Sequence, residues 1–156
     1  MKNILILGSE GFLGSVLVPY ILKNNNYNVI GIDKCFFGKN NKNTKNFKFY
    51  KKDYNQLSSK FFEKFDYIID LVNISNDPAS ELNQKFTYLT NFSNKVKLYK
   101  KIKNLRKLSR YIYMSSCSVY GNNKKLINEK SLPKPISLYS KLCLKYENYL
   151  KSENKI

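Results

Sequence analysis

A glycine-rich turn stands near the start of the chain, where a short apolar run gives way to a helical pattern. Gly8, Gly11 and Gly14 have GxxGxxG spacing. Phe12 and Leu13, which stand between the second and third glycines, begin the expected helix. The first glycine allows a tight turn, the second lets a pyrophosphate approach the backbone, and the third lets a helix pack closely on a strand. The pyrophosphate would lie at the helix N-terminus, where unpaired N–H groups and the helix dipole favour an anion.

An acidic residue, Asp33, follows roughly 20 residues after the turn, at the end of the next apolar run. A carboxylate there can accept hydrogen bonds from both hydroxyls of an adenosine ribose and repel a 2′-phosphate, which favours NAD over NADP. The adjacent Lys34 makes that preference less definite. The plainer alternative is a turn that only packs a helix on a strand, with Asp33 in solvent.

The pattern of the whole chain predicts the elements that must position this turn. Apolar runs rich in Ile and Val predict buried strands, and the stretches between them predict helices, which together predict an α/β fold with a parallel sheet. Right-handed crossovers and a switch point between the first and fourth strands favour the strand order 3-2-1-4-5, with helices on both faces. The expected strands are residues 3–8, 28–33, 47–50, 66–71 and 110–115; the expected helices are 12–23, 79–105 and 136–152.

Composition indicates one globular domain with an excess of basic residues. The chain has 156 residues, of which 42% are apolar, and its formal net charge is +17. Such a charge raises nucleic acid or an anionic membrane surface as a partner. However, 26 of the 28 basic residues are lysines, whereas proteins that read bases and phosphates favour arginine. A drift toward Lys and Asn therefore explains the charge better than nucleic-acid binding does.

Cysteine usage and the lengths of the apolar runs indicate a cytoplasmic, soluble protein. Cys35, Cys117 and Cys143 are an odd number without CxxC spacing, and the chain has no histidine, so neither a disulfide framework nor a zinc site is expected. Gly8 interrupts the first apolar run early, which argues against a cleavable signal peptide. We expect no membrane helix, since no stretch reaches the roughly 18 uninterrupted apolar residues that one needs.

Taken together, the motifs of the chain resemble the extended short-chain dehydrogenase/reductase family, and within it the NAD-dependent nucleotide-sugar epimerases and dehydratases such as UDP-galactose 4-epimerase. The likeness covers nearly the whole chain. It rests on the glycine turn and Asp33, on Lys52-Asp53-Tyr54, on residues 71–78 and 114–121, and on Asn91 and Tyr139. The resemblance implies a Rossmann-type, doubly wound parallel sheet over residues 1–156, with NAD as the cofactor.

The resemblance also assigns cofactor-binding roles to residues beyond the glycine turn. Asp53 and the backbone of Tyr54 would bind the adenine edge. Leu71, Val72 and Asn73 would run under the cofactor. Val72 and Asn73 depart from the small residues that the family usually has there, so they would narrow the space for a bound dinucleotide.

Three polar residues farther along the chain receive roles in the same way. Asn91, on the expected long helix, would support the cofactor-binding loop after the fourth strand. Ser116 and Tyr139 match the family's hydroxyl pair, in which a tyrosinate takes the proton of a sugar hydroxyl while hydride leaves to the nicotinamide, and the serine holds the same oxygen. Without the resemblance, Ser116 would only satisfy backbone groups and Tyr139 would be an aromatic residue near a helix start.

The chain departs from the family at the lysine of the YxxxK pattern, where it has Cys143. Lowering a tyrosine pKa from about 10 to about 7 requires roughly 4 kcal/mol of differential stabilisation, which a neutral thiol does not supply. On a helix, Lys141 and Lys145 are rotated from Tyr139 by about 200° and about 240°, so neither replaces the missing cation. We therefore expect Tyr139 to stay protonated near neutral pH.

Length is the other departure, because members of the family are much longer and hold the nucleotide sugar with a C-terminal lobe. The resemblance therefore implies a domain that lacks the substrate lobe, binds NAD and is weakly active or inactive. The fifth strand would be an exposed sheet edge, which invites association. Two alternatives stay open: an enzyme completed by a companion C-terminal chain, and a lysine-rich module that binds anions or nucleic acid. A homo-oligomer is also open as a partner.

Overall fold

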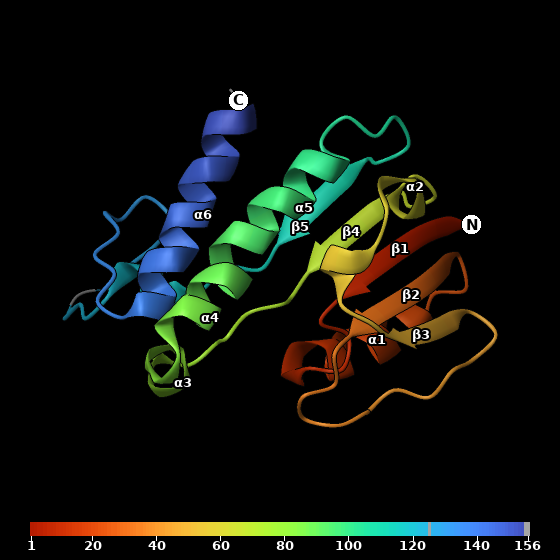
Figure 1. The fold of residues 1–156 in the computed structure, drawn as a ribbon, viewed down its shortest axis with the longest axis horizontal. Helices are drawn as coiled ribbons and strands as arrows, with labels where there is room; N and C mark the ends of the chain where they lie inside the picture. Colours follow the sequence, from red (N-terminus) through yellow and green to blue (C-terminus); the bar gives the residue numbers. More distant parts are fainter. Residues whose placement is uncertain (125, 155–156) are drawn as a thin grey trace. The chain divides into compact units, whose positions relative to one another are not determined.

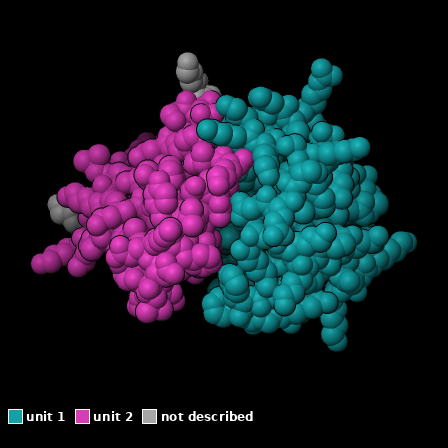
Figure 2. Space-filling view, in the orientation of Figure 1, with its two compact units in different colours: residues 1–72, 98–114 teal, residues 73–97, 115–156 magenta. Residues whose placement is uncertain are grey.

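The computed structural model describes residues 1–124 and 126–154, which form two compact units (Figure 2). Unit 1 comprises residues 1–72 and 98–114, and unit 2 comprises the described part of residues 73–97 and 115–156. The glycine turn and Asp33 belong to unit 1, whereas Ser116 and Tyr139 belong to unit 2. The two groups of predicted site residues are therefore described separately.

Unit 1 is built on a five-stranded sheet in the order β3-β2-β1-β4-β5, and every neighbouring pair of strands is parallel (Figure 1). The strands are β1 (Lys2–Leu7), β2 (Tyr27–Asp33), β3 (Phe47–Lys51), β4 (Tyr67–Asp70) and β5 (Arg110–Tyr113). This order confirms the predicted Rossmann-type topology. β3 lies at one edge of the sheet, as its short apolar run predicted.

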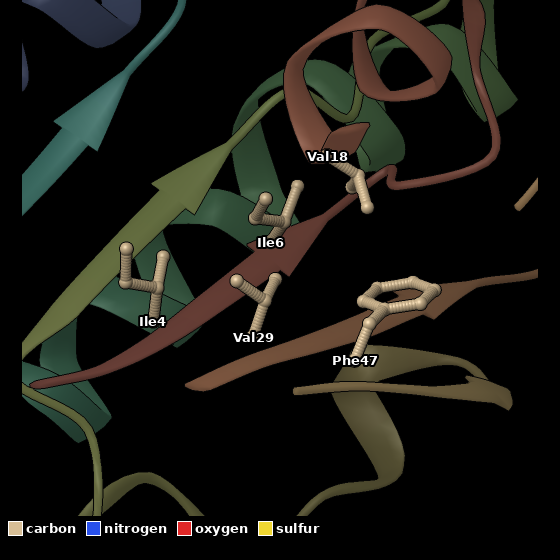
Figure 3. Close-up of a cluster of buried hydrophobic side chains, with 5 residues drawn as sticks. All are labelled: Ile4, Ile6, Val18, Val29 and Phe47. Atoms are coloured by element: carbon tan, nitrogen blue, oxygen red, sulfur yellow. The ribbon is translucent and has the colours of Figure 1, made fainter. Parts of the chain in front are cut away.

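One face of the sheet is covered by α1 (Phe12–Leu22). Val18 of α1 packs in a buried cluster with Ile4 and Ile6 of β1, Val29 of β2 and Phe47 of β3 (Figure 3). Because alternate strand residues point to opposite faces, these strand side chains share the face toward α1. The cluster fixes α1 against β1 and β2. It thereby fixes the glycine turn, which joins β1 to α1.

The opposite face carries the C-terminal part of α5 (Asn94–Ile102), whose residues from Leu98 on belong to unit 1. The ring of Tyr99 lies 5.8 Å from that of Tyr111 on β5. Leu98 and Ile102 are buried, and so is Leu5, which alternates with the cluster residues of β1. Helices therefore cover both faces of the sheet, as the doubly wound fold requires.

The connection from β3 to β4 contains two short helices that the sequence did not indicate, η1 (Tyr54–Gln56) and α2 (Ser59–Phe62). Phe62 of α2 is fully buried. The Lys101 ammonium of α5 donates hydrogen bonds to the carbonyls of Asn55 and Leu57, at 3.3 and 3.0 Å. These contacts hold the segment after β3 against α5.

Unit 2 contains α3 (Asp77–Leu82), α4 (Gln84–Tyr88), the π-helical segment η2 (Leu89–Ser93), the start of α5, η3 (Cys117–Tyr120) and α6 (Leu138–Asn154). The prediction of one helix over residues 79–105 is wrong. Asn83 interrupts it with φ −146° and ψ 84°, and its side-chain oxygen accepts a hydrogen bond from the Phe86 N–H at 2.9 Å. An asparagine that caps a new helix competes with continuation of the old one.

The last helix also begins later than predicted, at Leu138 rather than residue 136. The Ser137 hydroxyl accepts a hydrogen bond from the Ser140 N–H at 3.2 Å, so Ser137 caps the first turn. Tyr146 of α6 is fully buried, and its hydroxyl donates to the Lys95 carbonyl at 3.2 Å. Among the described helices, none has both the length and the hydropathy that a membrane span demands.

Candidate functional site

The glycine-rich turn in unit 1 depends on the absence of side chains at Gly8 and Gly14. Gly8 has φ +81°, which favours glycine, and a Cβ there would lie 3.1 Å from the Leu71 carbonyl carbon and 3.2 Å from the Val72 nitrogen. A Cβ on Gly14 would collide with the carbonyl oxygens of Gly8 and Ser9. These glycines bring the end of β4 and the first turn of α1 close to the end of β1.

Gly11 has a different environment, because a Cβ there would meet only the Gly8 carbonyl oxygen, at 3.5 Å. Gly11 is the N-cap residue of α1 and supplies no side-chain hydrogen bond to the first turn. The first N–H groups of a helix have no partner within the helix, so they are left for solvent or for an anion. Phe12 and Leu13 begin this turn with side chains that are 86% and 48% exposed.

Asp33, at the carboxyl end of β2, is fixed by the backbone of the residues around it. Its Oδ2 accepts a hydrogen bond from the Glu10 N–H at 3.1 Å, and its Oδ1 accepts one from the Cys35 N–H at 2.7 Å. The side chain remains partly exposed. The structure therefore brings Asp33 to the glycine turn, the arrangement that the spacing of these residues predicted.

Asp53 is already engaged by its own chain. Its Oδ1 accepts hydrogen bonds from the backbone and side-chain nitrogens of Asn55 at 2.9 and 2.8 Å, and its Oδ2 lies 2.7 Å from the Lys34 ammonium. Burial acts to raise the pKa of Asp53, but the hydrogen bonds from Lys34 and Asn55 outweigh it and hold the pKa below its usual value. In the sequence, Lys34 made the preference for NAD over NADP less definite. In the structure, its ammonium pairs with Asp53.

An open pocket of about 570 Å³ adjoins this ion pair. Tyr54, next in the chain, begins η1 and is buried. The residues that line the pocket are Lys34, Lys51, Lys52, Asp53, Gln56 and Leu57. An adenine amino group that approached Asp53 from this side would have to share the carboxylate with Lys34 or displace it.

In unit 2, Asn91 holds the residues that follow β4. Asn91 lies in the π-helical segment η2, is fully buried, and hydrogen-bonds the backbone of Ile74 twice: its Oδ1 accepts from the N–H at 2.8 Å and its Nδ2 donates to the carbonyl at 3.1 Å. Asn73 precedes this clamp and is half-buried. Asn91 therefore holds the backbone just after β4, and its support of a cofactor-binding loop stays a prediction.

Unit 2 also brings Ser116 and Tyr139 together. Ser116 caps η3, where its hydroxyl accepts a hydrogen bond from the Ser118 N–H at 3.2 Å. Tyr139 lies in the first turn of α6, is buried, and has the Ser116 side chain close enough to act on its pKa. Residues from two distant parts of the chain thus form the predicted hydroxyl pair.

Cys143, one turn after Tyr139, is fully buried and contacts the same phenol. Burial raises the pKa of Tyr139, the neighbouring Ser116 side chain acts to lower it, and Cys143 and Cys117 add to the rise. Lys141 and Lys145 are exposed, and the Lys145 ammonium lies 4.5 Å from the centre of the Phe92 ring. The phenol is therefore in its neutral form near pH 7.

Sequence reasoning passed over two residues at the glycine turn, Glu10 and its partner Asn41, both of which are buried. A charged residue in a glycine-rich turn is normally solvated, and Asn41 stands in a stretch dominated by Lys and Asn, so neither residue was distinctive. Sequence reasoning also missed the hydrogen bond from the Ser115 hydroxyl to the Glu147 carboxylate in unit 2. The helical phase that Glu147 shares with Tyr139 and Cys143 was the one available signal.

Comparison with known proteins places these features in a family. Across residues 4–153, the chain matches the NAD dependent epimerase/dehydratase family. It is 34% identical to the dTDP-D-glucose 4,6-dehydratase of Dictyostelium discoideum over 90% of this chain and 37% of that protein. It is 32% identical to the uncharacterised protein MJ1055 of Methanocaldococcus jannaschii over 89% of this chain and 48% of that protein.

Solved structures show the same fold. The UDP-N-acetylglucosamine 4-epimerase of Methanobrevibacter ruminantium, in complex with UDP-N-acetylmuramic acid, superposes with a TM-score of 0.89 at 29% identity, over 99% of this chain and 51% of that one. The UDP-glucuronic acid 4-epimerase of Bacillus cereus, in complex with NAD, gives 0.86 at 28% identity, over 99% and 53%. The chain thus spans about half the length of these proteins. From its fold and its family match, we conclude that the chain belongs to the NAD dependent epimerase/dehydratase family.

Proposed function

We propose that the chain binds NAD through the ADP half of the cofactor. The observation that carries this proposal is the pairing of the open backbone at Gly11 with the Asp33 carboxylate, which the Glu10 N–H fixes at 3.1 Å. The pyrophosphate would lie against the first turn of α1, at Phe12 and Leu13, and Asp33 would accept hydrogen bonds from the adenosine ribose. The B. cereus relative, whose structure contains NAD, supports the same ligand.

The remaining cofactor residues have supporting roles in this proposal. Asp53 and the Tyr54 backbone bind the adenine edge, with Lys34 leaving or sharing the Asp53 carboxylate. The segment from Leu71 to Asn73 runs under the dinucleotide. Asn91 holds the backbone of Ile74, which follows that segment in the chain, through two hydrogen bonds. The exposed lysines beside the pocket add a favourable field for an anionic cofactor.

The reaction class that we propose is that of the family: epimerisation or dehydration of a nucleotide sugar, begun by hydride transfer to NAD. The matched proteins that act on dTDP- or UDP-sugars support this substrate class. Tyr139 would accept the proton of a sugar hydroxyl while Ser116 holds the same oxygen. We expect these residues alone to give low turnover, because burial and the neighbouring thiols keep the Tyr139 phenol protonated.

The test is calorimetric titration of the chain with NAD, compared with Asp33→Asn. The substitution keeps the size of the side chain and removes its charge, so we expect NAD affinity to fall about tenfold, which corresponds to about 1.4 kcal/mol. Asp77→Asn makes the same chemical change at an exposed site in unit 2 and is the matched control. Equal affinities of the chain and Asp33→Asn for NAD, or tighter binding of NADP than of NAD, would contradict the assignment.

A working enzyme completed by further polypeptide is the second candidate, favoured by the chain's spanning about half the length of its structural relatives. Coexpression with the second half of the M. ruminantium epimerase tests it. If completion is what the chain needs, UDP-sugar turnover appears only when both polypeptides are present. A complex that forms without turnover would assign the defect to Tyr139 and Cys143 instead.

A further inference from the structure

A second carboxylate, that of Glu10, lies inside the glycine-rich turn and is only 2% exposed. Its Oε2 accepts hydrogen bonds from the backbone N–H groups of Asn40 and Asn41, at 2.6 and 2.8 Å. Its Oε1 accepts from the Asn41 side-chain amide at 3.2 Å and from the Ser9 hydroxyl at 3.3 Å. Both carboxylate oxygens are thus satisfied by donors from the loop and from the turn.

The partners of Glu10 belong to the polar loop of residues 34–46, the long orange segment between β2 and β3 in Figure 1. Two more hydrogen bonds join the loop to the turn: Asn41 Nδ2 donates to the Ser9 carbonyl at 2.9 Å, and Asn40 Nδ2 donates to the Glu10 carbonyl at 2.7 Å. Asn41 is 7% exposed although its loop is mostly exposed. One point of this loop is therefore anchored in the interior of unit 1.

The chemistry of burial explains why this anchor holds. A buried carboxylate that loses its hydrogen-bond donors carries a large desolvation penalty, and buried N–H groups that lose an acceptor carry one as well. Release of the loop would leave Glu10 without the Asn40 and Asn41 donors. Because hydrogen bonds to charged groups are the stronger kind, the loop is held more firmly than its polar, lysine-rich sequence indicates.

Glu10 also reaches the proposed ribose site, because its own N–H donates to Asp33 Oδ2 at 3.1 Å. One residue thus contacts Asp33 through its backbone and the loop that begins after Asp33 through its side chain. The segment between these contacts includes Cys35, at φ +57°, whose N–H holds Asp33 Oδ1. Both oxygens of Asp33 are therefore oriented by backbone that the Glu10 side chain helps to fix.

We propose that Glu10 is a positioning residue for the cofactor, which latches residues 40–41 onto the glycine turn and so presets the Asp33 carboxylate for the adenosine ribose. This inference rests on the proposed binding of NAD and extends it to a residue whose carboxylate is bonded by the protein's own donors.

Glu10→Gln tests the hydrogen bonds that join Glu10 to Asn40 and Asn41, which we call the latch. The substitution keeps the size of the side chain but places an NH₂ donor among groups that are themselves donors. We expect amide hydrogen exchange at Asn40 and Asn41 to become at least tenfold faster and NAD affinity to fall about tenfold. Glu63→Gln makes the same charge change at an exposed residue in unit 1 and should change neither quantity. Unchanged exchange at Asn40 and Asn41 would overturn the latch.

A double-mutant cycle separates positioning from general stabilisation. If Glu10 acts through Asp33, Glu10→Gln should weaken NAD binding much less in an Asp33→Asn background than in the original chain. Equal losses in the two backgrounds, or faster exchange with unchanged affinity, would overturn the positioning role. If the original chain does not bind NAD, the proposed function fails first, and the titration of the unmodified chain shows this directly.

Asn41→Ala keeps the test decisive if Glu10→Gln does not fold. It removes the side-chain hydrogen bonds to Ser9 and Glu10 but leaves the carboxylate with both backbone donors. We expect exchange at Asn40 and Asn41 to rise by a smaller factor, with a correspondingly smaller loss of NAD affinity. Loss of affinity without faster exchange would overturn the inference.

Discussion

The glycine turn of unit 1 and the hydroxyl pair of unit 2 match the motifs of the resemblance to different extents. The turn keeps a positive φ at Gly8, an open backbone at Gly11 and a fixed carboxylate at Asp33. The pair keeps Ser116 beside Tyr139, but a buried thiol occupies position 143, where the resemblance implies a lysine. In the proposed function, cofactor binding and activation of the tyrosine therefore depend on separate residues and can be lost separately.

The difference has a physical origin. The turn is held by backbone geometry, so a change at one of its glycines disturbs the packing of β1, β4 and α1 together. Position 143, by contrast, accepts a neutral side chain without disturbing the helix, since Cys143 packs in a buried cluster with Val119 and Tyr139. Retention of the turn is thus required by the fold, whereas a cation at position 143 is required only by the proposed chemistry.

Gly14→Ala should give the largest effect, because its methyl group meets backbone rather than a movable side chain. We expect the free energy of unfolding to fall by about 2–3 kcal/mol, as for an overpacked core, and NAD binding to weaken with it. Chemical denaturation measures the first and calorimetry the second. A stable Gly14→Ala chain would mean that the turn is less constrained than its geometry indicates.

Gly11→Ala sharpens the comparison within the turn, since its methyl group would meet only one atom, at an ordinary contact distance of 3.5 Å. We expect the melting temperature to change little while NAD affinity falls about tenfold or more, because the methyl group occupies space that the pyrophosphate needs. Thermal melting followed by NAD titration separates the two quantities. Unchanged NAD affinity in a folded Gly11→Ala chain would place the pyrophosphate elsewhere.

Cys143→Lys addresses the second region. An ammonium next to the phenol should lower the pKa of Tyr139 by roughly one unit or more, because a nearby opposite charge favours the ionised form. Cys143→Met is the control, since it keeps the site neutral. The pKa is read from the ring-carbon NMR signal of Tyr139, assigned by its loss in Tyr139→Phe. The same pKa in both variants would show that the lysine charge does not reach the phenol.

The sheet was predictable because its information is local. Each strand is a short run that contains β-branched, aromatic or other apolar residues, and the handedness of crossovers leaves few orders for the five strands. The break at Asn83 was not predicted, since a single asparagine inside an apolar periodicity is a weak signal until its cap hydrogen bond to Phe86 is seen. Local patterns thus located the elements better than they located the ends and breaks of helices.

The candidate site was predictable where it depends on spacing and hidden where it depends on long-range polar contacts. The positions of Gly8, Gly14 and Asp33 directly after the first two strands were enough to predict them as site residues. Glu10 and Asn41 do not, because they are about thirty residues apart and each is an ordinary residue in its own segment. The Lys34–Asp53 pair lies between these extremes, since the predicted adjacency of the second and third strands brings both residues to one end of the sheet.

One measurement tests the central claim that the chain retains cofactor binding but does not activate its tyrosine. The ring-carbon NMR signal of Tyr139 is followed against pH in the unmodified chain saturated with NAD, with saturation monitored by shifts of the amide signals of Gly11 and Asp33. Burial and the neighbouring thiols raise the pKa of Tyr139, so we predict a bound cofactor and a phenol that stays protonated through about pH 8. Ionisation of Tyr139 near pH 7, or amide signals of Gly11 and Asp33 that do not respond to NAD, would contradict the account.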